Sequence, residues 1–352
     1  MKHRKWPWVL CGILVVLLVA LFIERDLVRM IFYSNYDPQN RLDVENWTGG
    51  TAHMGVQYAD VSETDYLNLY VPESETPPPL IVAIHGGGFI LNDCESRQAQ
   101  LFYQYFRDHG YAVATVNYRL AQEAKFPAAV QDVKAAVRFL KANADTYGYD
   151  ASRVAVWGES AGGYLCVMAG VTAEGEFDDL PFIGEDALEE PVSSRVDVVL
   201  DYYGAVKLES GADRKAAFAA LGVPGFVVDI ANGWLAAPLK EMPGFRTCED
   251  AWMGKNFEDM TAEEIQAAQP LYYAEKNLGA NVDPEILIWH GDADITVPWT
   301  QSRALYDVAS EKLGADRVTF EIHHNCKHAD ENMYSDETLA RLDAYLRQAL
   351  GK

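Results

Sequence analysis

Short apolar runs alternate with longer amphipathic stretches through most of the chain after residue 79. Each run is continuous rather than alternating, which is typical of parallel strands that are buried on both faces. In the stretch 128–144, Val130, Val133, Val137 and Leu140 recur every three or four residues, so they share one face of a helix. The pattern predicts strands over 80–84, 112–117, 154–157, 196–202, 285–289 and 318–322, and helices over 96–109, 128–144, 164–169, 300–313 and 337–350.

Two further strands, 55–61 and 66–71, are predicted ahead of this series, with the polar turn 62–65 between them. Strands that alternate with helices form a parallel sheet whose two faces are both covered. The sequence therefore predicts an α/β domain over 55–352, with a mostly parallel eight-stranded sheet and helices on both faces.

Residues 205–269 interrupt this alternation and are too many for an ordinary connection between a strand and the next element. They hold a mostly apolar stretch, 218–239, and a second aromatic cluster around Trp252. We expect a helical cap insertion that lies over the active site and shapes the substrate pocket. The alternative is an extra helical subdomain that only packs against the domain.

The N-terminal segment is apolar and carries positive charge only at its start. Three basic residues fall within 1–5, and residues 6–23 carry no charge. These eighteen residues would span about 27 Å as a helix, which is enough for a bilayer core. We expect residues 1–24 to be a single-pass membrane anchor that leaves the catalytic domain outside the cytoplasm, with 25–54 as a connector. The alternative is a signal segment that is cleaved, so that the protein is secreted.

The amino-acid composition argues against some classes of binding partner and of metal site. The formal net charge of −23 over 352 residues argues against binding of nucleic acid or of an anionic membrane through a basic face. Membrane contact is therefore expected through the N-terminal segment only. No pair of cysteines has the C-x-x-C spacing of a zinc or redox site, and pairing in disulfides stays open. The five cysteines are Cys11, Cys94, Cys166, Cys248 and Cys326.

The candidate nucleophile is Ser160, which lies between Gly158 and Gly162 where a predicted strand meets a predicted helix. This G-x-S-x-G pattern is typical of a nucleophile elbow, a sharp turn that exposes a serine hydroxyl at the edge of a sheet. Glycines are needed there because strand and helix approach each other closely. The pattern is short enough to occur by chance, so the remaining catalytic groups must be found elsewhere.

A second glycine-rich stretch, His85-Gly86-Gly87-Gly88, directly follows the strand predicted over 80–84. Acyl transfer needs N–H donors aimed at the oxygen that becomes negative, and residues without side chains let backbone amides reach it. The expected oxyanion hole consists of the amides of Gly87, Gly88 and Ala161.

A serine at neutral pH needs a general base, and the base needs a carboxylate that orients it. Asp292 and Asp294 follow the strand 285–289, and we assign Asp294 as the acid and Asp292 to the structure of the loop. The last strand is followed by His323, His324 and His328. We assign His328 as the base because it lies furthest out on the loop, and His324 is the alternative.

Together these motifs resemble the α/β-hydrolase superfamily of esterases and lipases. The segments that carry the resemblance are His85-Gly-Gly-Gly-Phe89, Asn117-Tyr-Arg-Leu-Ala121, Gly158-Glu-Ser-Ala-Gly-Gly163 and His290-Gly-Asp-Ala-Asp294. The sequence is similar to the hormone-sensitive-lipase-like branch and to the acetyl-esterase and feruloyl-esterase-like branch. The resemblance implies the triad Ser160, Asp294 and His328 and the oxyanion hole named above.

The sequence thus favours a serine carboxylic-ester hydrolase that forms an acyl-enzyme with short-acyl or carbohydrate-linked esters, which are small molecules. It requires no metal and no organic cofactor. Two alternatives stay open: an amide hydrolase of the formamidase or peptidase type on the same triad, and a tethered binding domain without catalysis. Acyl and alcohol specificity and the oligomeric state are not indicated.

Overall fold

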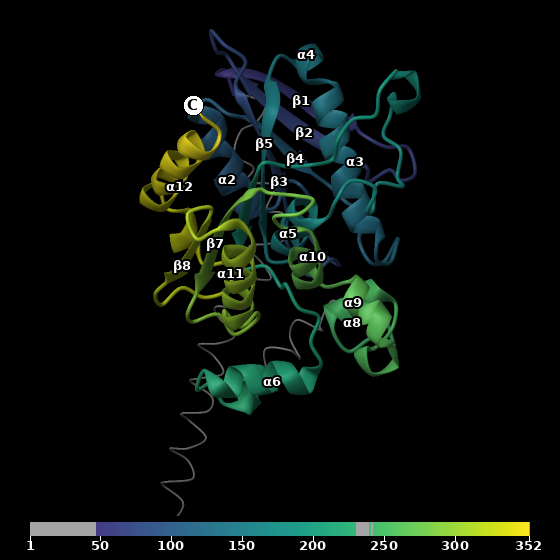
Figure 1. Ribbon diagram of the computed structural model, residues 1–352, viewed down its shortest axis with the longest axis vertical. Helices are drawn as coiled ribbons and strands as arrows, with labels where there is room; N and C mark the ends of the chain where they lie inside the picture. Colours follow the sequence, from purple (N-terminus) through teal and green to yellow (C-terminus); the bar gives the residue numbers. More distant parts are fainter. Residues whose placement is uncertain (1–46, 230–238, 241, 352) are drawn as a thin grey trace, which may run out of the picture.

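The computed structural model describes residues 47–229, 239–240 and 242–351 of the chain. They form one eight-stranded sheet in the order β1-β2-β4-β3-β5-β6-β7-β8 (Figure 1). Only the β1–β2 and β2–β4 pairs are antiparallel, which confirms the predicted mostly parallel eight-stranded sheet. The strands are β1 (Gly50–Gln57), β2 (Tyr66–Pro72), β3 (Pro79–Ile84), β4 (Ala112–Val116), β5 (Asp150–Glu159), β6 (Val198–Tyr202), β7 (Glu285–Gly291) and β8 (Val318–His323).

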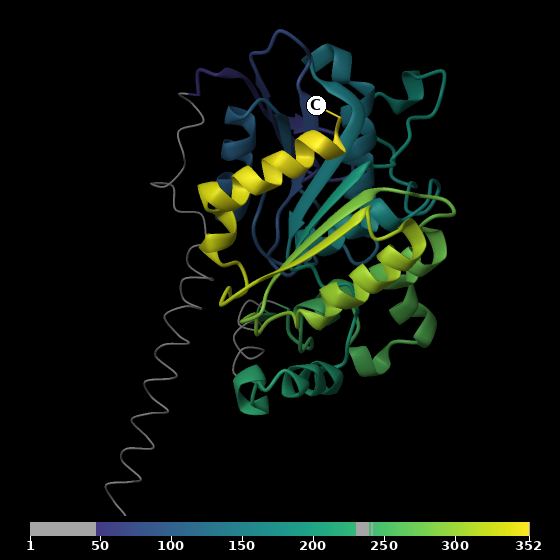
Figure 2. The ribbon, with the colours of Figure 1, turned by 60° about the vertical axis from the view of Figure 1, so that its left-hand side comes forward.

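Helices cover both faces of this sheet. The core on one face includes side chains of α3, α5, α10 and α11, and the core on the other face includes side chains of α2 and α12. Figure 2 shows α11 and α12 on opposite sides of the last strands. These helices and the short ones near them are α2 (Arg97–Asp108), α3 (Ala128–Ala142), α4 (Ala144–Tyr147), α5 (Ala161–Val171), η2 (Glu185–Ala187), α10 (Pro270–Asn277), α11 (Thr300–Leu313), η5 (Glu331–Tyr334) and α12 (Asp336–Ala349).

The two cores explain why the central strands are continuous apolar runs. In β3, Val82 and Ile84 belong to the core on one face, whereas Ile81 and Ala83 belong to the core on the other. Because successive side chains of a strand point to opposite faces, a strand between two helical layers has no position left for a solvated side chain. The central strands can therefore contribute to a functional site only through their carboxyl ends and the loops that follow them.

The first strand is the main error of the sequence prediction. It runs over Gly50–Gln57 and not over 55–61. Gly55 has a φ of +64°, and the pairing with β2 shifts register between His53 and Val56. Tyr58, which follows the strand, is fully buried in the core. An exposed edge strand with a bulge has no regular apolar pattern in its sequence. The buried residues that follow β1, such as Tyr58, are apolar, and for this reason the sequence prediction placed the strand too far toward the C-terminus.

The described part of the insertion between β6 and α10 includes the short helices α6 (Gly211–Ala220), α8 (Cys248–Met253) and α9 (Ala262–Ala267) and the 3₁₀ turn η4 (Phe257–Asp259). Trp252 of α8 stacks on Phe89 with ring centroids 4.2 Å apart and meets the edge of Tyr164 at 5.0 Å. The insertion therefore packs on the loop after β3 and on the helix after β5. It lies beyond one end of the sheet (Figure 1).

The expected anchor, residues 1–24, and most of the connector lie outside the described residues. Among the helices that the structure describes, none has the length and apolar character needed to span a bilayer.

Candidate active site

Ser160 sits at the junction of β5 and α5, between Glu159, which ends the strand, and Ala161, which begins the helix. Its φ of 54° and ψ of −116° lie in a region that is unfavourable for a residue with a side chain. Two backbone hydrogen bonds hold this conformation: its N–H donates to the carbonyl of Tyr202 at 2.9 Å, and its carbonyl accepts from the N–H of Tyr164 at 3.0 Å. The turn therefore projects the serine side chain beyond the edge of the sheet.

The two glycines of the motif are required by the close approach of strand and helix. A Cβ atom on Gly158 would collide with the carbonyl oxygen of Gly162, and one on Gly162 would collide with that of Ile84. Both obstacles are backbone atoms, which cannot rotate away. As the sequence predicts, both glycines are needed because strand and helix are too close for a side chain.

Ser160, His328 and Asp294 form one continuous chain of hydrogen bonds. His328 Nε2 lies 2.9 Å from Ser160 Oγ, and His328 Nδ1 lies 2.7 Å from Asp294 Oδ2. Because a carboxylate can only accept, Nδ1 must carry the proton, and Nε2 is left as an acceptor for the serine hydroxyl. The structure therefore brings together, in the expected order, the three side chains assigned from the sequence.

Asp294 is almost fully buried and has a complete set of donors. Its Oδ1 accepts the amides of Thr296 at 2.7 Å and Val297 at 3.0 Å, and its Oδ2 also lies 3.2 Å from His290 Nε2. Burial alone would raise the pKa of this carboxyl, but the attraction of His328 and hydrogen bonds from both histidines lower the pKa well below its usual range. Asp294 is therefore an ionised, immobile partner for His328.

The side chain of His328 is only 9% exposed, and its ring meets the edge of Tyr203 at a centroid distance of 4.8 Å. Burial lowers the pKa of the imidazole, but the charge of Asp294, their hydrogen bond and the charge of Glu159 outweigh it. The net effect is a pKa above 6.5. The imidazolium that forms when His328 takes a proton is thus stabilised in place.

The glycine loop after β3 has the backbone conformation expected of an oxyanion loop. Gly87 and Gly88 have φ values of 112° and 60°, which residues with side chains rarely adopt. Among residues 47–229 and 242–351, no acceptor takes the N–H of either glycine. Ala161 is the first residue of α5, so its N–H has no acceptor within the helix. In the part of the chain that the structure describes, the three amides predicted for the oxyanion hole therefore have no acceptor within the protein.

Glu159, next to the nucleophile, fixes this loop to the elbow. Its Oε1 accepts the N–H of Gly86 at 2.7 Å, although the two residues are 73 positions apart. The carboxyl is 3% exposed, and burial raises its pKa against the opposing effects of His328, the Gly86 amide and Tyr203. The side chain of Glu159 therefore fixes the position of the oxyanion loop relative to the nucleophile next to it.

The alternative base, His324, lies in a second histidine–aspartate pair further from the core. Its Nδ1 is 2.8 Å from Asp292 Oδ2, and 82% of its side chain is exposed. Asp292 also accepts the N–H of Asn325 at 2.6 Å, which agrees with the loop-forming role assigned to it. Only His328 is hydrogen-bonded to Ser160 among the described histidines.

Two polar residues of the site were missed at the sequence level. Glu159 is the variable position of G-x-S-x-G, and His290 opens the His290-Gly-Asp-Ala-Asp294 segment. His290 is fully buried, with Nδ1 2.7 Å from Ser302 Oγ and Nε2 3.0 Å from the carbonyl of Val297. A histidine at the end of a buried strand, four residues before the acid, was the available signal. No group of three or more potential metal-binding side chains occurs in the described part of the chain.

The chain is similar to known esterases in sequence and in fold. The BD-FAE family model matches residues 67–308. Among curated proteins, Esterase LipC of Mycobacterium tuberculosis is 26% identical over 232 residues, which are 66% of this chain and 48% of that protein. Ethyl acetate hydrolase of Pseudomonas putida is 35% identical over 105 residues, 29% of this chain and 33% of that protein. The chain thus spans about half or less of the length of these relatives.

Solved structures resemble most of the chain. A truncated form of carbohydrate esterase from gut microbiota has a TM-score of 0.65 and 26% identity, and the match covers 87% of this chain and 98% of that chain. A thermophilic esterase of the Planctomycetes species Thermogutta terrifontis has a TM-score of 0.56 and 20% identity, with 86% of this chain and 94% of that chain covered. The second likeness supports the fold alone.

Proposed function

The chain belongs to the BD-FAE family, an α/β-hydrolase esterase family, and on this basis we propose that it is a serine carboxylic-ester hydrolase. The observation that carries the proposal is the hydrogen-bond chain from Ser160 through His328 to Asp294, at 2.9 and 2.7 Å. The hydrogen-bonded series begins at the strained elbow of Ser160, next to three backbone amides that have no acceptor among the described residues. This is the arrangement that acyl transfer needs.

The reaction follows from the donors and acceptors. Ser160 Oγ attacks the ester carbonyl carbon while His328 Nε2 takes the hydroxyl proton, and Asp294 holds the resulting imidazolium. The amides of Gly87, Gly88 and Ala161 stabilise the oxyanion of the tetrahedral intermediate. His328 then gives its proton to the leaving alcohol, an acyl-enzyme remains on Ser160, and a water molecule activated by His328 releases the acid.

We propose short-acyl and carbohydrate-linked esters as substrates. Similarity to a structure described as a carbohydrate esterase, and to a protein named ethyl acetate hydrolase, supports this class. We also propose that the insertion acts as a cap. In support, Cys248 of α8 lies so near the oxyanion loop that a Cβ on Gly88 would be 3.1 Å from its sulfur. Substrate next to that loop would therefore contact the insertion.

The substrate proposal is tested with a panel offered to the full chain: p-nitrophenyl acetate, butyrate and octanoate, an acetylated xylo-oligosaccharide, and p-nitroacetanilide. We expect kcat/KM to be highest for acetyl esters, to fall as the acyl chain lengthens, and to be lowest for the anilide. A preference for the anilide would replace the proposal by an amide hydrolase. Absence of hydrolysis across the panel would favour a binding domain without catalysis.

We further propose that residues 1–24 anchor the catalytic domain to a membrane, outside the cytoplasm. The support is the uncharged stretch 6–23 behind a basic start. The full chain should fractionate with membranes and resist extraction with carbonate, whereas a chain lacking 1–24 should be recovered in the soluble fraction with its esterase activity. Recovery of the intact full chain in the soluble fraction would overturn the anchor, and a shortened N-terminus there would indicate a cleaved signal.

A further inference from the structure

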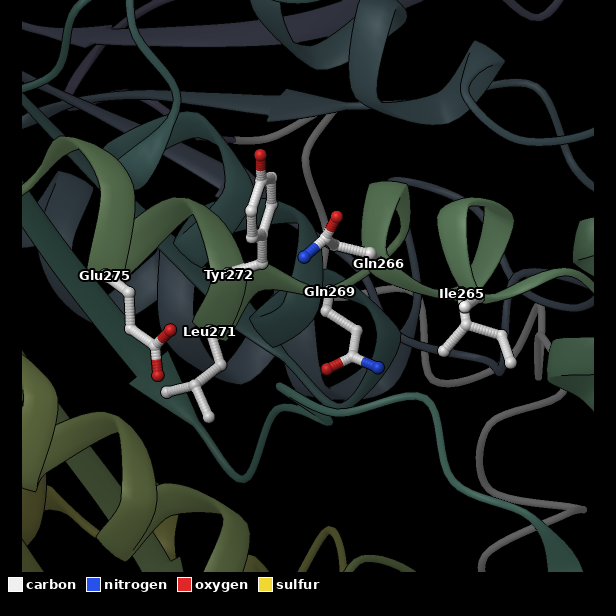
Figure 3. Close-up of a pocket in the computed structure, with 7 residues that line it drawn as sticks. Ile265, Gln266, Gln269, Leu271, Tyr272 and Glu275 are labelled. Atoms are coloured by element: carbon white, nitrogen blue, oxygen red, sulfur yellow. The ribbon is translucent and has the colours of Figure 1, made fainter.

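A pocket of about 320 Å³ lies at the surface of the insertion, where α9 turns into α10 (Figure 3). None of the residues that line it belongs to the triad or to the oxyanion loop, and Gln266 and Glu275 among them are exposed. The turn that follows β6 lies in the core instead. One of its residues, Tyr203, contacts the catalytic base directly, although no step of the ester hydrolysis described above uses it.

Tyr203 is strained although it is fully buried. Its φ of 47° lies in the left-handed region, which a residue with a bulky side chain rarely adopts. Such a conformation persists only where the surrounding structure holds it, and strained residues cluster at functional sites. The conformation of Tyr203 therefore needs both a structural cause and a consequence for the site.

The cause is that the turn is held from three directions. The N–H of Tyr203 donates to the carbonyl of Trp289 in β7 at 2.8 Å, and the N–H of Gly204 donates to Asp201 Oδ1 at 2.9 Å. The turn also lies against α5, because a Cβ atom on Gly204 would be only 2.7 Å from the carbonyl carbon of Gly163. The backbone of Tyr203 therefore cannot relax without displacing β7 or the helix that follows the nucleophile.

The consequence is that the ring of Tyr203 packs on the imidazole of His328. The two ring centroids are 4.8 Å apart and the rings are inclined by 61°, which is an edge-to-face contact. The hydrogen bonds of His328 to Ser160 and Asp294 fix the two nitrogens of the imidazole. These two bonds alone leave the imidazole able to tilt about the line through its nitrogens. The ring of Tyr203 supplies a third contact that opposes this tilt.

The hydroxyl of Tyr203 makes a second contact, with the segment that follows His328. It is hydrogen-bonded to the hydroxyl of Tyr334 in η5, and both tyrosines are buried. Ala329, which directly follows His328, has a φ of 56°, so the loop that carries the base is itself strained. Tyr203 thus contacts both the imidazole and the element in which the loop of the base ends.

We propose that Tyr203 is a positioning residue for the catalytic base, whose ring holds the imidazole of His328 between Ser160 and Asp294. The inference rests on the proposed esterase function and names a further residue on which its rate depends. A misplacement of about 1 Å in a reacting group can lower a rate by about 10²-fold. The effect falls on kcat, because His328 moves a proton in the reaction and does not hold the bound ester.

The kinetic test separates the ring of Tyr203 from its hydroxyl. kcat and KM for p-nitrophenyl acetate are measured for the full chain and for Tyr203→Leu, Tyr203→Met and Tyr203→Phe. We expect kcat to fall about 10- to 100-fold in the Leu and Met variants, with KM within about twofold, because the imidazole can tilt. The Met variant fills the space left by the ring with an adaptable side chain and keeps the test independent of a cavity. Tyr203→Phe keeps the ring and should stay within about threefold of the unaltered protein.

A second measurement reports the position of the imidazole without catalysis. The Nδ1 proton of His328, which lies in the 2.7 Å hydrogen bond to Asp294, should give a far-downfield ¹H NMR signal that is absent from His328→Ala. The signal should persist in Tyr203→Phe. It should broaden or vanish in the Leu and Met variants, because a tilting imidazole weakens this hydrogen bond and lets the proton exchange with water.

Tyr111→Phe is the matched control. Tyr111 is also buried, its hydroxyl donates to Asp343 at 2.8 Å, and it lies at the amino end of β4, whereas the triad lies beyond the carboxyl ends of the strands. Loss of this hydroxyl should leave kcat and the NMR signal unchanged.

Unchanged kcat in the Leu and Met variants, or an equal loss in Tyr203→Phe, would overturn the positioning role and leave the esterase function standing. Absence of hydrolysis by the unaltered protein would overturn the esterase function instead. The NMR comparison would then still decide the role of Tyr203: a signal that depends on the ring would support it, and a signal that persists in all variants would overturn it.

Discussion

Replacing Ser160 with alanine is expected to lower kcat for p-nitrophenyl acetate by about 10⁴-fold or more. Among the described residues, the nucleophile hydrogen-bonded to His328 Nε2 is the hydroxyl of Ser160, at 2.9 Å, which His328 can deprotonate for attack on a carbonyl. An alanine has no atom there, so the acyl-enzyme cannot form and only the oxyanion amides remain. The measurement is the steady-state rate, together with mass spectrometry after exposure to diethyl p-nitrophenyl phosphate. The unaltered protein should gain one phosphoryl adduct at Ser160, and the variant should gain none.

Ser152→Ala is the matched control for this result. Ser152 lies near the start of β5, whereas Ser160 directly follows the other end of the same strand, and the Ser152 side chain is exposed. It should retain full activity and full labelling. The thermal unfolding temperature of Ser160→Ala should stay close to that of the unaltered protein, because both side chains have a Cβ and meet the same strain at a φ of 54°. Substantial hydrolysis by Ser160→Ala, with no contamination, would show that another group is the nucleophile.

Most of the sheet could be predicted because its strands are buried on both faces. The run Leu80-Ile-Val-Ala-Ile84 contributes side chains to two cores at once, so every position is apolar and the strand is visible in the sequence. The same reasoning fails at the edge of the sheet. There, β1 is largely exposed and is bent at Gly55, so no periodic pattern identifies its bounds.

The sequence predicts that the insertion is helical, but it does not predict where the individual helices begin and end. α8 and α9 have six residues each, too few for an apolar repeat to stand out. Their starts nevertheless carry a readable signal: Thr247 with Asp250 and Thr261 with Glu264 both form capping boxes. A search for this spacing would have placed the N-termini of both helices from the sequence alone.

The reactive residues could be found because each follows a strand whose position was predictable. Ser160 follows β5, Asp294 follows β7 and His328 follows β8, and the carboxyl ends of parallel strands meet at one edge of the sheet. Glu159 and His290 could not be assigned in this way. Their roles depend on which distant amide or hydroxyl each one reaches in the core, at Gly86 and Ser302, and spacing in the sequence does not encode those contacts.

Replacing His328 and His324 separately is expected to give opposite results. His328→Ala should lower kcat/KM for p-nitrophenyl acetate by about 10⁴-fold, because the proton acceptor for Ser160 and the link to Asp294 are both lost. His324→Ala should leave activity within about twofold, because it removes only an exposed pair with Asp292, which is worth about 1 kcal/mol or less. The two variants are compared by steady-state kinetics, with unfolding curves as the check on folding.

The pH profile separates the two histidines further, since only a deprotonated base can accept the serine proton. The charges of Asp294 and Glu159 raise the pKa of His328, so kcat/KM should fall as the pH drops through a value above 6.5. His324→Ala should keep this acid limb unchanged, because His324 is not part of the hydrogen-bond chain to Ser160. If His324→Ala abolished the limb, or if both variants lost activity equally, His328 would not be established as the base. Two histidine–aspartate pairs on neighbouring loops look alike in the sequence, and what distinguishes them is that only the buried pair reaches the nucleophile.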